Sequence, residues 1–478
     1  MKKIFLLTII CSLLFSCRKA VEVNPPDTGL VSKSVYEQNS TAEAAVTAIF
    51  SLMAQGGMAD GQQSISCDMG LSADELVNFS SDITLSKFYS NSLVSNMNPY
   101  FWPDIYQKIY IANSAIEGLT SSTTLSFGIK QQLLGEAKFI RAFQYFYAVN
   151  LYGDVPLTLT TDFRINIVLK RSPQKDVYAQ IIADLKDAQI LLSDDYKLPT
   201  GKPTMERVRP NKATATALLA RVYLYQSDWV NAEQQANSLL INNTKYALES
   251  NLNNTFLTTS TEAIWQLYAV NPQINTNDGT VFILIGTPSE SYPVALSSAI
   301  IGAFEPGDNR FNNWVGIFQD TSKRPFTNYY YPYKYKQEYG APITEYQTLF
   351  RLAEQYLIRA EAEIQQNKVA NGVADLNVLR RRARAAATVA IPNPLPDLPT
   401  NLSKADALTA VLHERQVELF TEWGHRWFDL KRTGNLDAVM SSLNMVKNRI
   451  WTPDAQLLPI PRGEIIANPN LIQNKGYN

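Results

Sequence analysis

The apolar positions of this chain recur mostly at three- and four-residue intervals, the spacing that places side chains on one face of an α-helix. The segment from Ser40 is an example. Ser40 to Glu43 has capping-box spacing, apolar residues follow at helical intervals to Met53, and Gly56-Gly57 ends the run. The same pattern predicts helices at about 102–117, 133–152, 173–191, 213–224, 232–240, 349–364, 373–385 and 404–420.

Two of these predicted helices follow each other closely and carry small residues on one face. Alanines recur every three or four residues from Ala213 to Ala220 and again from Ala232 to Ala236, with Asp228 between the two runs. Small side chains let neighbouring helices approach closely. A helix–turn–helix unit of roughly thirty residues is similar to a tetratricopeptide repeat. The expected fold is therefore mostly α, a scaffold of helical pairs.

Residues 56–101 and 243–345 interrupt the helical pattern. They are rich in Asn, Ser, Thr, Gly, Pro and aromatic residues, and loops of this length inside a compact protein are usually functional. Within the second region, residues 263–268 and 329–335 have strand-like composition, and the second of these suggests alternating strand packing. We expect a loop-rich subdomain with short strands at 243–345, inserted in the helical scaffold.

The first residues have a different pattern. Lys2 and Lys3 precede an apolar run of about 12 residues, shorter than the roughly 20 that a membrane-spanning helix needs. A positive start, an apolar middle and a small-residue exit predict a secretory signal at residues 1–16. Cys17 at the exit is similar to the lipidated cysteine of bacterial lipoproteins; a plain secretory signal is the alternative. Residues 17–39, with Pro25 and Pro26, would then form a tether.

Composition and charge narrow the class of protein. The 478 residues include 43 Lys+Arg and 44 Asp+Glu, for a net charge of −1, so no general attraction to nucleic acid or anionic membranes is expected. Of the three cysteines, Cys11 lies in the signal and Cys17 follows it. Cys67 is left alone, so no internal disulfide is expected, and Cys67 is interpreted as a small buried residue.

None of the charged motifs predicts catalysis. Glu414 and Glu418 lie one turn apart on a predicted helix, a pattern typical of ion pairs that fix helix packing. His413-Glu414 begins like a zinc-protease motif but lacks a second histidine at i+4, and the chain has only two histidines. No Gly-x-Ser-x-Gly elbow or Gly-rich phosphate loop occurs. We therefore expect no enzyme activity, no catalytic residue, no metal and no cofactor.

A run of arginines, Arg380, Arg381 and Arg382 followed by Arg384, could suggest nucleic-acid binding. On a helix these side chains project around different faces. In an exported, slightly acidic protein, a solvated and ion-paired helix face is the favoured interpretation.

Four stretches of the chain resemble the SusD/RagB family of Bacteroidetes outer-membrane nutrient-binding lipoproteins. They are EAKFIRAFQYF with LYGDVPL at 136–157, FRLAEQYLIRAEA at 350–362, ERQVEL with GHRWFDLKR at 414–432, and PIP with NPNLIQN at 459–474. Their order and spacing cover almost the whole mature chain, and the cysteine after the signal fits the same family.

The resemblance implies a fold, a location and a partner. The fold would be mostly α, with four tetratricopeptide-like helix pairs and a variable loop-rich region. The N-terminal scaffold would span 40–242 with a ligand loop at 56–101, and the C-terminal helical region, 346–478, would pack back on it. The protein would be lipid-anchored in the outer membrane, facing outward. Its partner would be a SusC-like TonB-dependent transporter, which it would cover as a hinged lid and supply with nutrient.

A sugar site needs flat aromatic side chains and short polar partners, because sugar rings expose apolar C–H faces and a rim of hydroxyls. Residues 78–102 and 290–318 are rich in both types, whereas Trp102 is interpreted as helix core. Within them, Tyr89 and Trp314 are the favoured stacking platforms. The full set of candidate ligand-binding residues is Phe79, Phe88, Tyr89, Asn91, Tyr292, Asn313, Trp314 and Phe318.

These observations favour a protein that binds an oligosaccharide without chemical conversion. Peptide capture within the same family is the first alternative, and an acidic or backbone-pairing groove would favour it. A surface glycoside hydrolase is the second alternative. It would require two carboxylates facing each other across a cleft, about 5–10 Å apart.

Overall fold

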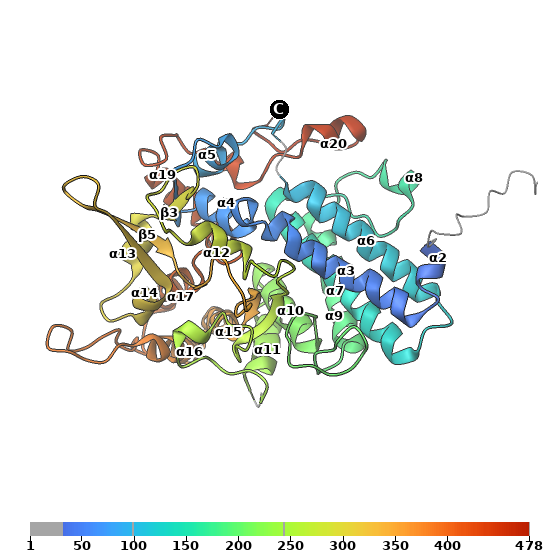
Figure 1. Ribbon diagram of the computed structural model, residues 1–478, viewed down its shortest axis with the longest axis horizontal. Helices are drawn as coiled ribbons and strands as arrows, with labels where there is room; N and C mark the ends of the chain where they lie inside the picture. The colour runs from blue at the N-terminus through green and yellow to red at the C-terminus, as the bar shows by residue number, and fades with distance from the viewer. Residues whose placement is uncertain (1–31, 98–99, 242–243, 478) are drawn as a thin grey trace, which may run out of the picture.

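The computed structural model describes residues 32–97, 100–241 and 244–477. Long helices dominate it and run through the right and centre of Figure 1. In chain order they are α3 (Asn39–Gln55), α6 (Phe101–Ser121), α7 (Phe127–Tyr152), α9 (Gln174–Leu191), α10 (Lys212–Tyr225), α11 (Trp229–Leu240), α15 (Leu352–Gln365), α16 (Val369–Ala383) and α17 (Lys404–Leu419). Contacts join α6 to α7, α7 to α9, α9 to α10, α10 to α11, α11 to α15 and α15 to α16. The predicted mostly α fold of helical pairs is confirmed.

Local sequence sets several helix starts. Asn211 and Thr214 form a reciprocal capping box at the start of α10. At the start of α17, the Ser403 hydroxyl accepts a hydrogen bond from the backbone N–H of Asp406, as its position predicts. These caps satisfy backbone donors that have no partner inside the helix.

Several helix predictions are wrong at their ends; α7, for example, begins at Phe127 and not at Leu133. The capping box expected at Ser40 does not form, because α3 already begins at Asn39 and the preceding Gln38 makes no side-chain cap. The helix expected from Leu349 begins only at Leu352, because residues before it form strand β6 (Gln347–Arg351). All five β6 residues are buried, and its two apolar residues, Leu349 and Phe350, continue directly into the apolar positions of the helix, so the sequence does not mark the boundary.

The loop expected at 56–101 contains regular structure. Every residue of α4 (Ile65–Ser72) is buried, so this helix has no polar face and no amphipathic pattern to reveal it. The ordered elements of this segment before α6 are η2 (Gly57–Ala59), η3 (Gly61–Gln63), α4, β1 (Leu76–Asn78) and α5 (Ile83–Tyr89).

The strands form three two-stranded antiparallel sheets. In them β1 pairs with β3 (Val294–Leu296), β2 (Ala263–Leu267) with β6, and β4 (Val315–Asp320) with β5 (Thr327–Pro332). The strand predicted near 263–268 is confirmed. The one predicted at 329–335 is displaced, since β5 ends at Pro332, and its burial does not alternate.

Short helices surround these strands on the left and upper side of Figure 1. The structure thus has short strands and irregular segments where the subdomain was expected. The remaining elements are α2 (Ser32–Val35), α8 (Phe163–Asn166), η4 (Leu252–Asn254), α12 (Asn277–Phe282), α13 (Ser298–Ala303), α14 (Asn309–Trp314), α18 (His425–Arg432), α19 (Leu436–Ser442), η5 (Pro453–Gln456) and α20 (Arg462–Ala467).

An aromatic cluster joins the helical scaffold to the strands. The ring of Trp265 on β2 lies 4.9 Å from Phe139 and 5.2 Å from Phe143 on α7, both edge-on, and 5.5 Å from Phe350 on β6. All four side chains are fully buried. This cluster fixes β6 against α7, and therefore fixes where Arg351, the last residue of β6, enters the charge network described below.

The N-terminal predictions lie mostly outside the described residues. The signal at 1–16, Cys17, Pro25 and Pro26 all fall there. Within the described part, Tyr36 is buried against Gly118 of α6, so the last residues of the expected tether belong to the folded body. Cys67 is buried as expected. Among the described residues, none of the helices combines the length and apolar character needed to cross a membrane.

Candidate functional site

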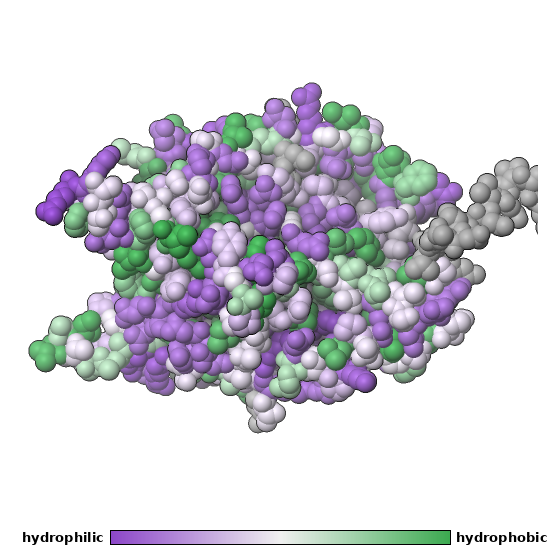
Figure 2. Space-filling model, in the orientation of Figure 1, coloured by the Kyte–Doolittle hydropathy of each residue, from purple (hydrophilic) through white to green (hydrophobic). Residues whose placement is uncertain are grey.

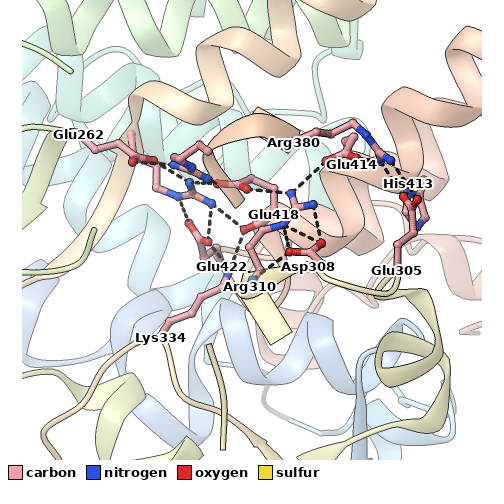
Figure 3. A network of polar contacts seen from close by, with 12 residues as sticks. Glu262, Glu305, Asp308, Arg310, Lys334, Arg380, His413, Glu414, Glu418 and Glu422 are labelled. Carbon is pink, nitrogen blue, oxygen red and sulfur yellow. Dashed lines mark hydrogen bonds and ion pairs between the residues drawn. The ribbon is translucent and has the colours of Figure 1, made fainter. Parts of the chain in front are cut away.

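A network of buried charges lies where β6, the start of α14 and α17 meet, and Figure 3 shows its side chains converging from these elements. At its centre, the fully buried Glu418 accepts hydrogen bonds from Arg351 at 2.6 Å, from Arg310 at 3.0 Å and from Arg382. The acidic members are Glu262, Glu305, Asp308, Glu414, Glu418 and Glu422, and the basic members are Arg310, Lys334, Arg351, Arg380 and Arg382.

The arginines decide the charge state of Glu418. Burial by itself would raise the pKa of this carboxyl group, but Arg382, Arg351 and Arg310 outweigh burial and hold the pKa well below its usual value. Glu414, one turn earlier, accepts hydrogen bonds from Arg310 and Arg380. The prediction that these two glutamates form structural ion pairs is confirmed.

The expectation for the arginine run is only partly correct. Arg381 and Arg384 pair with Asp397 near the surface, as a solvated face would. Arg380 and Arg382, however, are almost fully buried and belong to the charge network. The sequence could not indicate this because their partners are Glu262, Glu305 and two glutamates of α17, which lie on other segments of the chain.

The network fixes the turn between α13 and α14. Arg310 binds both oxygens of Asp308, and Arg380 binds both oxygens of Glu305. Gly307, between these acids, has φ +80° and lies against Pro394, which leaves no room for a side chain. Buried ion pairs therefore fix one side of this turn, and the 385–395 segment packs against another side.

Above this turn lies a cavity of about 510 Å³, which we call the aromatic groove. In Figure 2 the left edge of the molecule is hollowed between two projecting segments, with hydrophobic residues in the hollow. The groove is lined by Ile301, Phe304, Glu305, Pro306, Gly307, Asp308, Phe311, Asn312, Ala385, Ala386, Thr388, Ile391 and Pro394.

Three half-buried aromatic rings form a row that begins inside the groove and continues outside it to β5. The rings of Phe304 and Phe311 lie 5.6 Å apart at 65°, and Phe311 lies 6.2 Å from Tyr330 on β5. Asn312 at the rim has an exposed side chain, one hydrogen bond of which goes to Asn309 at 3.3 Å. Aromatic rings beside a short amide are the combination that binds sugar rings.

Two of the candidate ligand residues are core residues, and for these the prediction is wrong. Trp314 is fully buried, donates its indole N–H to the Leu252 carbonyl at 3.0 Å, and lies 5.0 Å from the Lys334 ammonium. Phe88 is also fully buried and packs against Phe101. Neither ring has a face that a ligand could reach.

Three other candidates already have protein partners. The Tyr89 hydroxyl donates to the Val446 carbonyl at 3.3 Å, and the Lys447 ammonium lies 4.8 Å from its ring. Asn91 donates to the Ser72 carbonyl at 3.1 Å. Asn313 on α14 donates to the backbone of Asn309 and accepts from Asn253. Hydrogen bonds of this kind stabilise local structure.

Two of the remaining candidates lie on the face of the β4–β5 ribbon opposite to Tyr330. Phe79 is 38% exposed and its ring meets Tyr329 edge-on at 5.7 Å. Phe318 pairs with Tyr329 across the ribbon, so Phe79 and Phe318 share this face. The half-buried ring of Tyr292 lies against Gly286. The structure therefore brings Phe79 and Phe318 together but not the full predicted set.

Within the described part of the chain, Glu305, His413 and Glu414 bring possible metal-ligand atoms within 4.8 Å of one another. Arginines already occupy the carboxylates, since Arg380 binds both Glu305 and Glu414 and its positive charge would oppose a cation. His413 donates its Nε2 proton to the Ala303 carbonyl at 2.8 Å. This chemistry fits ion pairing and not a metal site.

A larger cavity of about 570 Å³ lies between the first turns of α7 and the end of α9. Its lining includes Ile129, Leu133, Ile190 and Leu198 but no aromatic side chain. The aromatic groove is therefore the better candidate for a stacked sugar.

Two family models match the described part of the chain. A SusD-like model described as "Starch-binding associating with outer membrane" covers residues 32–224, and the SusD family model covers residues 225–477. A SusD-like protein of Formosa agariphila is 26% identical over 97% of this chain and 96% of its own length. A second SusD-like protein of the same organism is 28% identical over 79% of this chain and 80% of its own.

Solved structures agree with this fold. A SusD superfamily protein from Bacteroides vulgatus superposes with a TM-score of 0.76 at 22% identity, covering 92% of this chain and 99% of that one. A laminarin-binding SusD-like protein gives 0.72 at 22% identity over 92% and 99% of the two chains. Surface glycan-binding protein A from Bacteroides uniformis gives 0.76 at 19% identity over 91% and 99%. The family models, which together span residues 32–477, show that this chain belongs to the SusD/RagB family.

Proposed function

We propose that this protein is an outer-membrane lipoprotein that binds an oligosaccharide nutrient in the aromatic groove and delivers it to a SusC-like TonB-dependent transporter. The observation that carries the proposal is the row of half-buried rings, Phe304, Phe311 and Tyr330, in and beside a cavity of about 510 Å³. Two relatives of the same fold are described as laminarin-binding and as surface glycan-binding.

The groove suits a ligand that arrives from water and must leave again. Its aromatic rings are only half-buried, so a sugar could stack on them without a large rearrangement of the protein. The buried ion pairs beneath the groove hold its floor in place before ligand arrives, which limits the ordering cost of binding. Preorganised, moderately exposed contacts favour capture and release over permanent retention.

Anchoring at Cys17 would place the protein on the outer membrane, consistent with the family description. Two or more acyl chains on this cysteine would anchor it stably without a spanning helix. The proline-bearing residues after Cys17 would then let the folded body move over the transporter while the lipid stays fixed.

The groove is proposed to bind its ligand without cleaving it. A glycoside hydrolase needs a carboxylic acid with a raised pKa to protonate the leaving group. The hydrogen bonds from Arg380 lower the pKa of Glu305, the partly accessible acid of the groove. Asp308, the other acid of the lining, is buried and bound by Arg310. Glu305 therefore serves better as a fixed anion than as a proton donor, and Asp308 is enclosed in its ion pair with Arg310.

Peptide capture is the alternative that one feature of the structure favours. The β4–β5 sheet has two strands, and an extended peptide would add a strand to it by backbone pairing while apolar side chains enter the groove beside Ile301 and Ile391. This alternative predicts binding of extended peptides and none of glycans.

Isothermal titration of the detergent-solubilised full-length protein separates these possibilities. The ligands are a panel of neutral and acidic polysaccharides, their oligosaccharides, and a matched set of extended peptides. The proposal expects saturable binding of one glycan class. Heat from peptides alone would favour the alternative, and release of shorter products from a bound glycan would identify an enzyme.

A further inference from the structure

A second cavity, of about 370 Å³, lies between the end of α3, the turn at Ala59 and Asp60, and the segment that follows β2. It shares no lining residue with the aromatic groove. We call it the Tyr268 pocket, after the exposed aromatic residue on its rim. Most of its lining comes from the two segments that interrupt the helical pattern of the sequence, together with the end of α3 and Gln347 of β6.

The pocket wall includes a buried amide side chain that the protein itself holds in place. Gln347 on β6 is only 6% exposed, and its Nε2 donates to the buried Asp278 carboxylate at 2.6 Å. The Oε1 atom of the same amide has no partner among the described residues. This oxygen has almost no accessible surface, so a ligand does not reach it, and the hydrogen bond from Nε2 to Asp278 fixes the amide as part of the wall.

The charge of the lining selects against anions. Asp60 is the charged residue among the side chains that line the pocket, and the lining includes no lysine, arginine or histidine. Burial, together with the nearby Asp104, raises the pKa of Asp60. A sulfated or uronic sugar would bring a second negative charge to this partly desolvated carboxyl group, which is unfavourable. A neutral hydroxyl donor would not.

An aromatic platform borders the opening. Tyr268 is 53% exposed, and its ring packs against the buried ring of Tyr346 at 5.3 Å and 47°. Packing on one side holds the Tyr268 ring in place and leaves its other surface to solvent. Such a fixed and exposed ring can stack on the apolar face of a sugar.

The walls of the pocket are held without any ligand. The Asn277 amide donates to the carbonyls of both Ala54 and Ala59, at 3.2 and 2.8 Å, and so ties the end of α3 to the following turn. Opposite, Asn275 accepts from the backbone N–H groups of Thr344 and Glu345. A pocket whose walls are already ordered needs little reorganisation to bind.

We propose that the Tyr268 pocket is a second binding site, which takes one uncharged terminal sugar unit. The ring stacks on Tyr268, and one of its hydroxyl groups donates to the exposed Asp60. The proposal rests on the glycan-binding function proposed above, and it adds a site that recognises chain ends and rejects acidic sugars. The aromatic groove would hold the body of a longer glycan.

Saturation-transfer NMR with the detergent-solubilised full-length protein tests the pocket. The probes are neutral disaccharides (laminaribiose, maltose, cellobiose, xylobiose and mannobiose), with glucuronic acid as the anionic comparison. Tyr268→Ala and Asp60→Asn should each weaken binding of the recognised disaccharide roughly tenfold, as expected for loss of one stacking or charged contact. Tyr110→Ala is the matched control, because Tyr110 is 54% exposed on α6 and lies outside both cavities.

The outcomes distinguish the second binding site from the glycan-binding function proposed above. Loss of disaccharide binding in the two pocket variants, with Tyr110→Ala and Phe311→Ala unaffected, supports the second site. If only Phe311→Ala weakens binding, or if wild type binds polysaccharides but no disaccharide, the second site is refuted and the glycan-binding function stands. If glucuronic acid binds as well as the neutral sugars, the charge argument fails. If wild type binds no saccharide of any length, the proposed function fails with it.

Discussion

Replacement of Glu418 by glutamine should destabilise the protein by about 3–5 kcal/mol, the usual effect of removing one partner of a buried ion pair. Glu418 is fully buried and its two oxygens accept from Arg310, Arg351 and Arg382. Glutamine keeps the size but offers one acceptor and turns an N–H₂ group toward a guanidinium. The buried arginines would then lack a balancing charge. Typical domains are stable by only about 5–15 kcal/mol, so the effect is large.

Urea unfolding at 25 °C, followed by far-ultraviolet circular dichroism, measures this effect as a change in midpoint at constant slope. The matched control is Asp397→Asn, because Asp397 also binds two arginines, Arg381 and Arg384, but near the surface. Surface pairs contribute about 0–1 kcal/mol. If the two variants lose equal stability, burial does not make the ion pairs of Glu418 more important for folding than the surface pairs of Asp397.

The same variant has a defined pH dependence. Because the folded-state pKa of Glu418 is held well below 4.5, the stabilising effect of its charge is present above pH 4.5 and is lost as pH falls through the folded-state pKa. The difference in stability between wild type and Glu418→Gln should therefore shrink in acid. If Glu418→Gln does not fold, Glu418→Asp, which keeps the charge, should fold with intermediate stability.

Three further predictions concern other parts of the molecule. Burial lowers the pKa of Lys431 from 10.5 to about 7. Between these pH values the unfolded chain binds one more proton than the folded protein, so the free energy of unfolding rises with pH. Relative to Lys431→Met, wild type should gain about 3 kcal/mol of stability between pH 7 and about pH 9.5, measured by paired urea unfolding curves. Gly372→Ala should destabilise the protein by about 1–3 kcal/mol, because the added Cβ would lie 2.5 Å from the carbonyl oxygen of Ala360. The control is Gly302→Ala, which has open space around it and should be neutral or stabilising. Thermal melts measure both variants. Cys17→Ala should move the protein from the membrane fraction to the soluble fraction, and continued membrane attachment would refute the lipid anchor.

The helical scaffold could be predicted because most of its helices have one apolar face and one polar face. The exceptions have a physical reason. Helix α4 and strand β6 are buried on every side, and a fully buried element has no polar face to set a period. The run from Leu349 to Ile364 therefore gave no indication that a strand ends at Arg351 and a helix follows.

The ligand region could be predicted only as a stretch of chain. Phe311 and Trp314 lie three residues apart on the same short helix, yet Phe311 faces the groove and Trp314 faces the core. The position of Trp314 follows from Lys334 and the charge network, whose members come from segments between Glu262 and Glu422. Composition identifies residues able to stack on a sugar, but tertiary contacts decide which of them remain exposed.

The central claim is that the aromatic groove binds a glycan, and calorimetry on matched phenylalanine variants tests it most directly. Phe304→Ala/Phe311→Ala removes both rings of the groove, whereas Phe127→Ala removes a 76% exposed ring at the start of α7 that lies outside it. For the glycan that wild type binds, the groove variant should lose about fivefold to about 150-fold in affinity, since each of the two stacking contacts contributes about 0.5–1.5 kcal/mol. The control should bind like wild type. Unchanged affinity in a folded groove variant would contradict the account.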